Sequence, residues 1–292
     1  MTITPDLEAP RPAAGPGFAD AVTFSFGDER TGCFGLARVG IADGSGSGLT
    51  LLFVDRETAA AAAEGGAALE EGAGWEDVRA GGLSTTVEAP LERWTIAFDG
   101  GADGAFALTF EAIGAPAAVS GGGMEGYEQL CRVRGVVRAG GRELRIECLG
   151  QRGHSWGAPD WERLTLARTL GAWLDPALAV VLSAFRPAGA SDHEHELVQA
   201  TLLEGTPAGP VAVEDPRLST AYDEEGRQRR AGWELWLAVD GDEDAVYPRR
   251  GAGEVLCGTS LNLGRLRLDC AFFRFRMDGR EGVGRYDVLR RV

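Results

Sequence analysis

The chemically richest part of the chain gathers a cation, an imidazole, two indoles and a carboxylate within residues 152–161. These side chains are Arg152, His154, Trp156, Asp160 and Trp161. If the segment from residue 151 to residue 156 is extended, side chains two residues apart project to one face, so the first three would lie together. Protonation of an alkene needs a general acid, an aromatic surface that stabilises positive charge and a pocket that controls access of water. The cluster could supply all three.

The spacing suggests a role for each member. Arg152 would hold a carboxylate, which we assign to Asp160, and Asp160 would orient or charge His154. The catalytic candidates are therefore His154, Asp160 and Arg152. The ligand-binding candidates are Trp156, Trp161, Gln151 and Ser155. The alternative interpretation is a buried network of arginine, carboxylate and histidine that closes the junction between two barrels, with the tryptophans filling core volume.

A hairpin leads into the sequence Gly-x-Arg-x-His-x-Trp-Gly at residues 150–157, and Asp-Trp follows at residues 160–161. With this pattern, residues 124–161 resemble bacterial tocopherol-cyclase-like and hydroxyneurosporene-synthase-like (carotenoid 1,2-hydratase-like) proteins of the lipocalin fold. The matching positions are Gly150, Arg152, His154, Trp156, Gly157, Asp160 and Trp161. In that family an acid usually precedes the histidine, and here the position is Gly153. A carboxyl group that could donate a proton or orient the imidazole is therefore missing from that position.

Relatives with known activity add water to a carotenoid double bond or close a chroman ring, and other lipocalin-like relatives promote pericyclic ring closures. The resemblance implies hydration, cyclisation or isomerisation of an apolar isoprenoid, terpenoid or related polyene, without a cofactor, in a cavity between two β halves. Gly153 favours an alternative, a protein that binds lipids or terpenoids without chemistry. A purely structural or interaction role is compatible with the same residues.

The composition excludes several classes of function. The chain has 44 acidic and 29 basic residues and a net charge of −15, which opposes binding to nucleic acids and anionic membranes. Every basic residue is arginine, so lysine-dependent chemistry, namely Schiff bases, covalent pyridoxal phosphate and the phosphate-binding loop, is ruled out. We expect a small apolar ligand as the partner, with no nucleic acid and no stable membrane insertion, and the oligomeric state stays open.

The cysteines and histidines predict no metal site. The five cysteines are Cys33, Cys131, Cys148, Cys257 and Cys270. They are odd in number, lack the CxxC spacing of metal sites and lie mostly in apolar stretches, as buried free thiols do. His193 and His195 form a His-x-His pair without a third ligand at informative spacing, so we favour a solvated loop or edge strand there. No cofactor is expected.

Short β-rich runs separated by glycine-rich turns recur along the whole chain. In the first half they are Ala21–Phe26, Gly32–Ile41, Leu49–Asp55, Trp94–Phe98, Phe106–Ala112, Cys131–Val137 and Glu143–Leu149. In the second half they are Leu164–Arg168, Ala179–Phe185, Glu196–Leu203, Trp233–Val239, Leu266–Phe275 and Gly284–Leu289. This pattern predicts an all-β protein of two lipocalin-like antiparallel β-barrel or sandwich halves packed together, with few short helices.

Two local predictions are more specific. Gly140-Gly141 is a two-residue turn that would join the alternating runs 129–138 and 142–149 in a β-hairpin. The alanine-rich segment Glu57–Glu71 is the main helical candidate, because alanine is the best helix former, Asp55 could cap the helix and glycines follow it.

The expected organisation has three parts. Residues 1–17 contain Pro5, Pro10, Pro12 and Pro16 and no apolar run, so we expect a disordered lead-in without a signal peptide or transmembrane helix, and a cytoplasmic protein. The glycine-rich stretch Ala115–Gly123 is the candidate boundary between an N-terminal lipocalin-like domain, 18–120, and a C-terminal one, 121–292, which would carry the motif.

Overall fold

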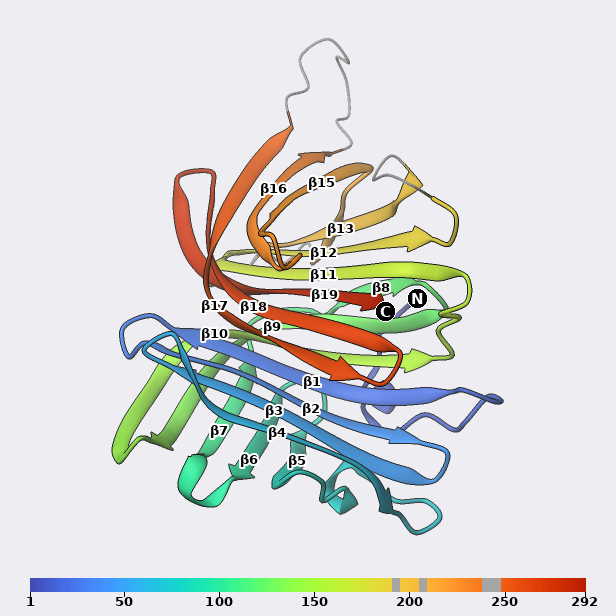
Figure 1. Ribbon diagram of the computed structural model, residues 1–292, viewed down its shortest axis with the longest axis vertical. Helices are drawn as coiled ribbons and strands as arrows, with labels where there is room; N and C mark the ends of the chain where they lie inside the picture. Colours follow the sequence, from blue (N-terminus) through green and yellow to red (C-terminus); the bar gives the residue numbers. More distant parts are fainter. Residues whose placement is uncertain (191–194, 205–208, 238–247) are drawn as a thin grey trace. The chain divides into compact units, whose positions relative to one another are not determined.

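The computed structural model describes residues 1–190, 195–204, 209–237 and 248–292 (Figure 1). It confirms the all-β prediction, because these residues form two curled antiparallel sheets and no α-helix. The described helical turns are three short 3-10 segments, η1 (Pro5–Glu8), η2 (Trp75–Asp77) and η3 (Gly101–Asp103). The chain divides into two compact units, Met1–Pro159 and Asp160–Val292.

The first unit is a ten-stranded sheet. Its strands are β1 (Ala19–Asp28), β2 (Cys33–Ala42), β3 (Ser45–Val54), β4 (Glu57–Ala68), β5 (Leu83–Ala89), β6 (Arg93–Asp99), β7 (Ala105–Ala112), β8 (Ala117–Gly121), β9 (Met124–Ala139) and β10 (Arg142–Gly157). They follow the order β4-β3-β2-β1-β10-β9-β7-β6-β5, and β8 pairs with β9. The strand that carries the motif, β10, therefore lies at the centre of the sheet, between β1 and β9.

Alternating side chains on the inner face of this sheet form the core of the first unit. In β1 the inward positions include Val22, Phe24 and Phe26, all buried. The ring of Phe24 packs 5.5 Å from that of Trp94 and 5.2 Å from that of Phe110. Burial of each such side chain stabilises the fold by about 1.5–3 kcal/mol, so the sheet curls around an aromatic centre.

The predicted hairpin is confirmed. Strands β9 and β10 pair in register from Ala139 opposite Arg142 to Met124 opposite Gly157. The turn residues Gly140 and Gly141 have φ of 57° and 72°, the left-handed conformation that both central residues of a type I′ turn require. The long, well-registered hairpin fixes which motif side chains face inward.

The helix prediction for Glu57–Glu71 is wrong. This stretch forms β4, which pairs antiparallel with β3 and buries Ala60 in the core. The preference of alanine for helix is less than about 1 kcal/mol per residue, and Gly65 and Gly66 weaken a helix further. Pairing with the exposed edge of β3 outweighs that preference.

The division between the units differs from the expected boundary at 120/121, because it falls after Pro159. Gly122 and Gly123 form the tight turn between β8 and β9 inside the first unit. Strand β10 belongs to the first unit because it pairs along one edge with β1 and along the other with β9. The motif therefore lies on the last strand of the first unit.

The beginning of the chain also differs from the expected disordered lead-in. Residues 5–8 form η1, and Glu8 at its end is only 3% exposed. The main-chain oxygen of Glu8 accepts a hydrogen bond of 2.8 Å from Trp75 Nε1. The prolines limit the conformations of this segment. The side chain of Glu8 also has a buried partner, which the local sequence does not reveal.

The described residues of the second unit form a nine-stranded antiparallel sheet. Its strands are β11 (Leu164–Asp175), β12 (Leu178–Pro187), β13 (Leu197–Glu204), β14 (Val211–Ala212), β15 (Asp215–Tyr222), β16 (Gln228–Trp236), β17 (Arg249–Leu263), β18 (Leu266–Met277) and β19 (Arg280–Arg291). The order is β14-β13-β12-β11-β19-β18-β17-β16-β15. Its core contains Trp233, Phe273 and Phe275. No helix among the described residues has the length and hydropathy needed to cross a membrane.

Candidate functional site

Residues 151–156 are extended, since they lie in β10, so the condition for the three side chains to share a face is met. Arg152, His154 and Trp156 all face the inner side of the first unit, and each is less than 10% exposed. The imidazole of His154 lies 4.9 Å from the indole of Trp156, measured between ring centres, with the ring planes at 65°. One strand thus brings the predicted cation, imidazole and indole together.

Arg152 is fully enclosed by polar and aromatic groups. Its Nη2 donates a hydrogen bond of 2.6 Å to Gln129 Oε1 on β9. The amide nitrogen of Gln129 donates to two main-chain oxygens, at 2.9 and 3.0 Å, which orients its oxygen toward the guanidinium. The guanidinium carbon lies 5.4 Å from the ring centre of Trp94 and 5.5 Å from that of Tyr127, distances typical of cation–π contacts.

The acidic partner of Arg152 is Glu8. Its Oε1 lies 2.8 Å from Arg152 Nη1, and both side chains are at most 3% exposed. The same carboxylate accepts hydrogen bonds from the hydroxyl of Tyr127 and from Trp94 Nε1. One carboxylate from the beginning of the chain is therefore held by three donors from β6, β9 and β10.

These contacts fix the protonation states around Glu8. Burial is the largest single influence on the Arg152 guanidinium and acts to lower its pKa, but the charge of Glu8 and the contributions of Tyr127 and Cys131 together leave that pKa raised. Burial is also the main cause of a raised pKa of Tyr127, to which the charge of Glu8 adds. Arg152 is thus charged and Tyr127 neutral, so the tyrosine acts as a hydrogen-bond donor to the carboxylate.

His154 is 1% exposed and uses both ring nitrogens. Nδ1 lies 2.7 Å from the main-chain oxygen of Leu7, and Nε2 lies 2.6 Å from Asp20 Oδ1. A carbonyl oxygen can only accept, so Nδ1 carries a proton. Nε2 shares a hydrogen bond with the carboxyl group of Asp20, so both edges of the ring are held in place.

The residues near the start of the chain contribute several groups to this cluster. Besides Leu7 and Glu8, the main-chain nitrogen of Arg11 donates a hydrogen bond of 2.5 Å to Asp20 Oδ2. The guanidinium of Arg11 lies 5.7 Å from the ring centre of Trp156. We call residues 4–11 the N-terminal segment. The segment contacts Arg152, His154, Trp156, Asp20 and Tyr127, which we call the inner cluster, and supplies part of its chemistry.

The pairing predicted between Asp160 and Arg152 is not formed. Asp160 belongs to the second unit, where its carboxylate lies 3.4 Å from Arg163 Nε and accepts a hydrogen bond from the main-chain nitrogen of Glu162. Strand β10 ends at Gly157, which has φ of 144°, and the chain then leaves the first unit. Asp160, the last acidic residue of the sequence pattern, therefore lies outside the strand that carries Arg152 and His154.

Trp161 and Asp160 are both placed in the second unit. The main-chain oxygen of Trp161 accepts a hydrogen bond of 3.4 Å from Arg291 Nη1.

The sequence analysis missed Asp20, although a signal existed, since Asp20 alternates with Val22 and Phe24 on the inward-facing side of β1. An acidic side chain at an inward-facing strand position is buried and needs a buried partner. For Glu8 no comparable periodic signal existed.

Gln151 and Ser155 project to the other face of β10. Gln151 Nε2 donates a hydrogen bond of 2.7 Å to Glu128 Oε2 on the neighbouring strand. Glu128 lies directly opposite Gly153 in the register, and a Cβ atom added to Gly153 would lie 2.4 Å from Glu128 Oε2. The carboxylate of Glu128 therefore occupies the space into which a side chain at position 153 would project.

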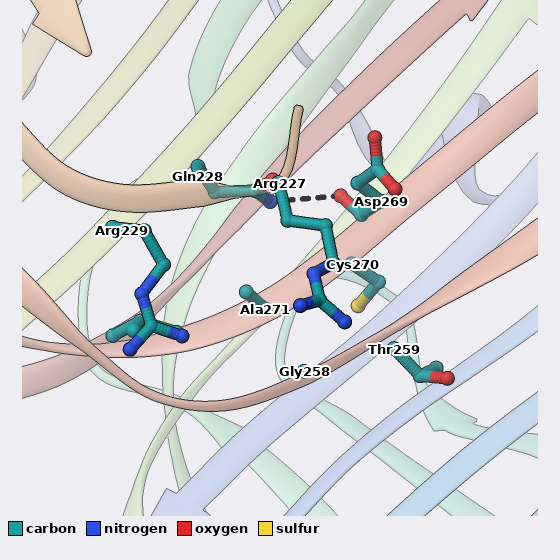
Figure 2. Close-up of a pocket in the computed structure, with 9 residues that line it drawn as sticks. Arg227, Gln228, Arg229, Gly258, Thr259, Asp269, Cys270 and Ala271 are labelled. Carbon is teal, nitrogen blue, oxygen red and sulfur yellow. Dashed lines mark hydrogen bonds between the residues drawn. The ribbon is translucent and has the colours of Figure 1, made fainter. Parts of the chain in front are cut away.

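The second unit contains a small cavity, drawn in Figure 2, of about 120 Å³. Its lining includes Arg227, Gln228, Asp269 and Cys270, and Gln228 Nε2 donates a hydrogen bond of 2.8 Å to the main-chain oxygen of Asp269. Pockets for drug-sized ligands are roughly 300–1,000 Å³, so this polar cavity has room for water or a small ion but not for a polyene.

Another buried ion cluster lies in the second unit. Glu196 pairs with Arg168 and, at 2.6 Å, with Arg186. Within the described residues no three His, Cys, Asp or Glu side chains are arranged to hold a metal ion. Of the His-x-His pair, His193 lies outside the described residues, and His195 is exposed.

Replacement of Glu8 tests the buried ion pair. We expect Glu8→Ala to lower the free energy of unfolding by about 3–5 kcal/mol, because it leaves the charge of Arg152 buried without a partner. The double variant Glu8→Ala/Arg152→Met should recover part of this loss. Chemical denaturation measures both. The matched control is Glu143→Ala, whose exposed pair with Arg138 should contribute less than about 1 kcal/mol. Equal small losses in both single variants would contradict the assignment.

Restoration of the acid before the histidine tests the role of Glu128. We expect Gly153→Asp to destabilise the protein by about 1–3 kcal/mol, because the new side chain overlaps the carboxylate of Glu128. The same substitution in a Glu128→Ala background should have a smaller effect, and a double-mutant cycle in urea measures the difference. Gly65→Ala is the control, since an added Cβ there meets no atom within 4 Å. Additive effects of the two substitutions would show that the side chains do not compete for space.

The fold has clear relatives among solved structures. A protein assigned as AttH from Nitrosomonas europaea superposes with a TM-score of 0.70 at 10% identity, over 94% of this chain and 93% of that one. Kievitone hydratase from Nectria haematococca gives a TM-score of 0.66 at 12% identity, over 94% and 89%. CghA with Sch210972 gives 0.67 at 12% identity, over 94% and 89%. At these identities the likeness shows the fold alone.

Sequence comparison defines the family. No curated protein sequence matches the chain. Residues 4–292 match the family described as "Domain of unknown function (DUF7064)". The match begins at Thr4, so it includes the N-terminal segment as well as both sheets. Because the match spans nearly the whole sequence, the chain belongs to the DUF7064 family.

Proposed function

We propose that the protein hydrates or cyclises an apolar small molecule, by adding a proton to a carbon–carbon double bond at the inner cluster of the first unit. The proposal rests on one observation. His154, whose Nδ1 faces a carbonyl oxygen and whose other nitrogen is held by Asp20, lies buried among aromatic rings. No cofactor is required for this step.

The geometry gives each group a task. Asp20 holds Nε2 at 2.6 Å and compensates the positive charge of the imidazolium, so Nδ1–H is the proton that can leave toward a ligand. Transfer of this proton forms a C–H bond from the π electrons of the alkene and leaves a carbocation on the neighbouring carbon. Water then adds to the cation, or a second double bond closes a ring, and loss of a proton restores the imidazolium.

Aromatic rings surround the proton donor. The ring centres of Trp156, Trp75 and Tyr127 lie 4.9, 5.4 and 5.7 Å from that of His154. Their π faces attract positive charge, which is worth about 2 kcal/mol or more where water is excluded. A carbocation formed beside the imidazole would therefore be stabilised by the same side chains that bury it.

Fold comparison supports the reaction class. Kievitone hydratase, named for a hydration reaction, shares this fold over most of its length. The resemblance of residues 124–161 to tocopherol-cyclase-like and hydroxyneurosporene-synthase-like proteins narrows the proposed substrate to an isoprenoid, a terpenoid or a related polyene. In this proposal Arg152 positions the ligand, and Asp20 takes the role that spacing had assigned to Asp160.

A second candidate is binding of a lipid or terpenoid without turnover. The observation that favours it is the capping of the proton donor by the chain itself, since Nδ1 of His154 already donates to the main-chain oxygen of Leu7. A ligand would have to replace that contact before any proton could be transferred. Turnover measurements separate the two candidates.

Deuterium incorporation tests the reaction. In D₂O, wild-type protein incubated with acyclic isoprenoids and polyenes should place one carbon-bound deuterium in each product molecule, detected by mass spectrometry. His154→Gln and Asp20→Asn should lower the rate by about 10²- to 10⁴-fold, the usual contribution of a general acid. His195→Gln, an exposed histidine of the second unit, is the control and should leave the rate unchanged. Undiminished deuteration in folded His154→Gln would contradict the role of this residue.

A further inference from the structure

The groups that hold Glu8 form a carboxylate site built entirely by the sheet of the first unit. Arg152, Tyr127 and Trp94 converge on its two carboxylate oxygens, and Gln129 fixes the guanidinium from behind. We propose that this site recognises the carboxylate of a small amphipathic acid, and that Glu8 is its resident occupant. The inference rests on the proposed function, because it names the substrate class for the same cluster.

The N-terminal segment is attached in the manner of a bound peptide. Residues 4–11 take no part in the strand pairing of the described sheet. The described hydrogen bonds between main-chain groups of this segment and the rest of the unit end on side chains: Trp75 donates to the oxygen of Glu8, His154 to that of Leu7, and Asp20 accepts from the main-chain nitrogen of Arg11. Removal of the segment would leave every strand ladder intact.

The apolar contacts of the segment indicate what the rest of the ligand must be. Leu7 of the segment and Ile3, which directly precedes it, pack against a small cluster of Phe18, Tyr127 and Trp156, where Leu91 also packs. A ligand that replaces the segment must fill this apolar space while its carboxylate reaches Arg152. The chemistry of the two parts together specifies an acid with an aliphatic or isoprenoid body.

Replacement of the segment would also expose the proton donor. Nδ1 of His154 points at the oxygen of Leu7, 2.7 Å away, within the space that the body of the ligand would enter. With the carboxylate of the ligand held by Arg152, a double bond near that end of the ligand would face this N–H. The carboxylate site therefore sets the position of the substrate relative to the acid.

Binding of decanoate to the full-length protein tests the proposal. Glu8→Ala vacates the carboxylate site, so it should bind decanoate at least roughly tenfold more tightly than wild type, in which Glu8 keeps the site closed for most of the time. Calorimetry measures the affinity, and a rise in melting temperature should accompany binding. Decanol, which has the same body without the charge, should not show this difference, and Glu8→Ala/Arg152→Gln should lose it. Equal gains for decanol and decanoate would overturn the proposal.

Hydrogen exchange in the wild-type protein provides a test that needs no destabilised variant. Saturating decanoate should speed amide exchange in peptides covering residues 3–12, because the acid displaces the segment, while exchange in the core strands stays unchanged. Unchanged exchange in residues 3–12 at saturation would overturn the proposal even if Glu8→Ala failed to fold. Neither measurement involves turnover, so the two proposals can fail separately. Binding of decanoate at this site, together with no deuteration of any substrate, would refute the proposed reaction but would leave the carboxylate site supported.

Discussion

A single buried charge organises the first unit. Arg152 projects inward from the central strand of the sheet, and a guanidinium cannot lose its proton inside a protein, so the fold must supply an anion and further acceptors around it. Glu8 and Gln129 provide them, at 2.8 and 2.6 Å. This requirement brings the start of the chain across the inner face, and the same crossing places Leu7 and Arg11 against His154 and Asp20.

The sequence allowed the fold to be predicted well where the pattern is local. Alternation gave most of the strands, and Gly140-Gly141 located the turn that sets the register of β9 and β10. Extension of residues 151–156 then placed Arg152 and His154 on one face. The assignment of Glu57–Glu71 to a helix failed because alanine has only a weak conformational preference, and a neighbouring strand edge outside the local window decided the outcome.

The acids of the site were harder to predict because spacing along the chain is a poor guide to partners across a sheet. Asp160 lies close to Arg152 in sequence, but β10 ends at Gly157 and carries the chain out of the unit. Asp20 and Glu8 are distant in sequence and reach the cluster through pairing of β1 with β10 and through the N-terminal segment. Likewise, the acid missing at Gly153 has a spatial counterpart in Glu128, on the adjacent strand.

The long separation between Glu8 and Arg152 has a consequence for biosynthesis. The two residues are 144 positions apart, and β1, made early, has β10 as one of its two neighbours. During synthesis, Glu8 cannot pair with Arg152, and one edge of β1 stays unpaired, until β10 has been made. Non-local contacts of this kind slow folding, so the nascent first unit should emerge largely complete before it gains its native topology, and chaperones that shield unpaired strand edges would have their longest opportunity to act in that interval.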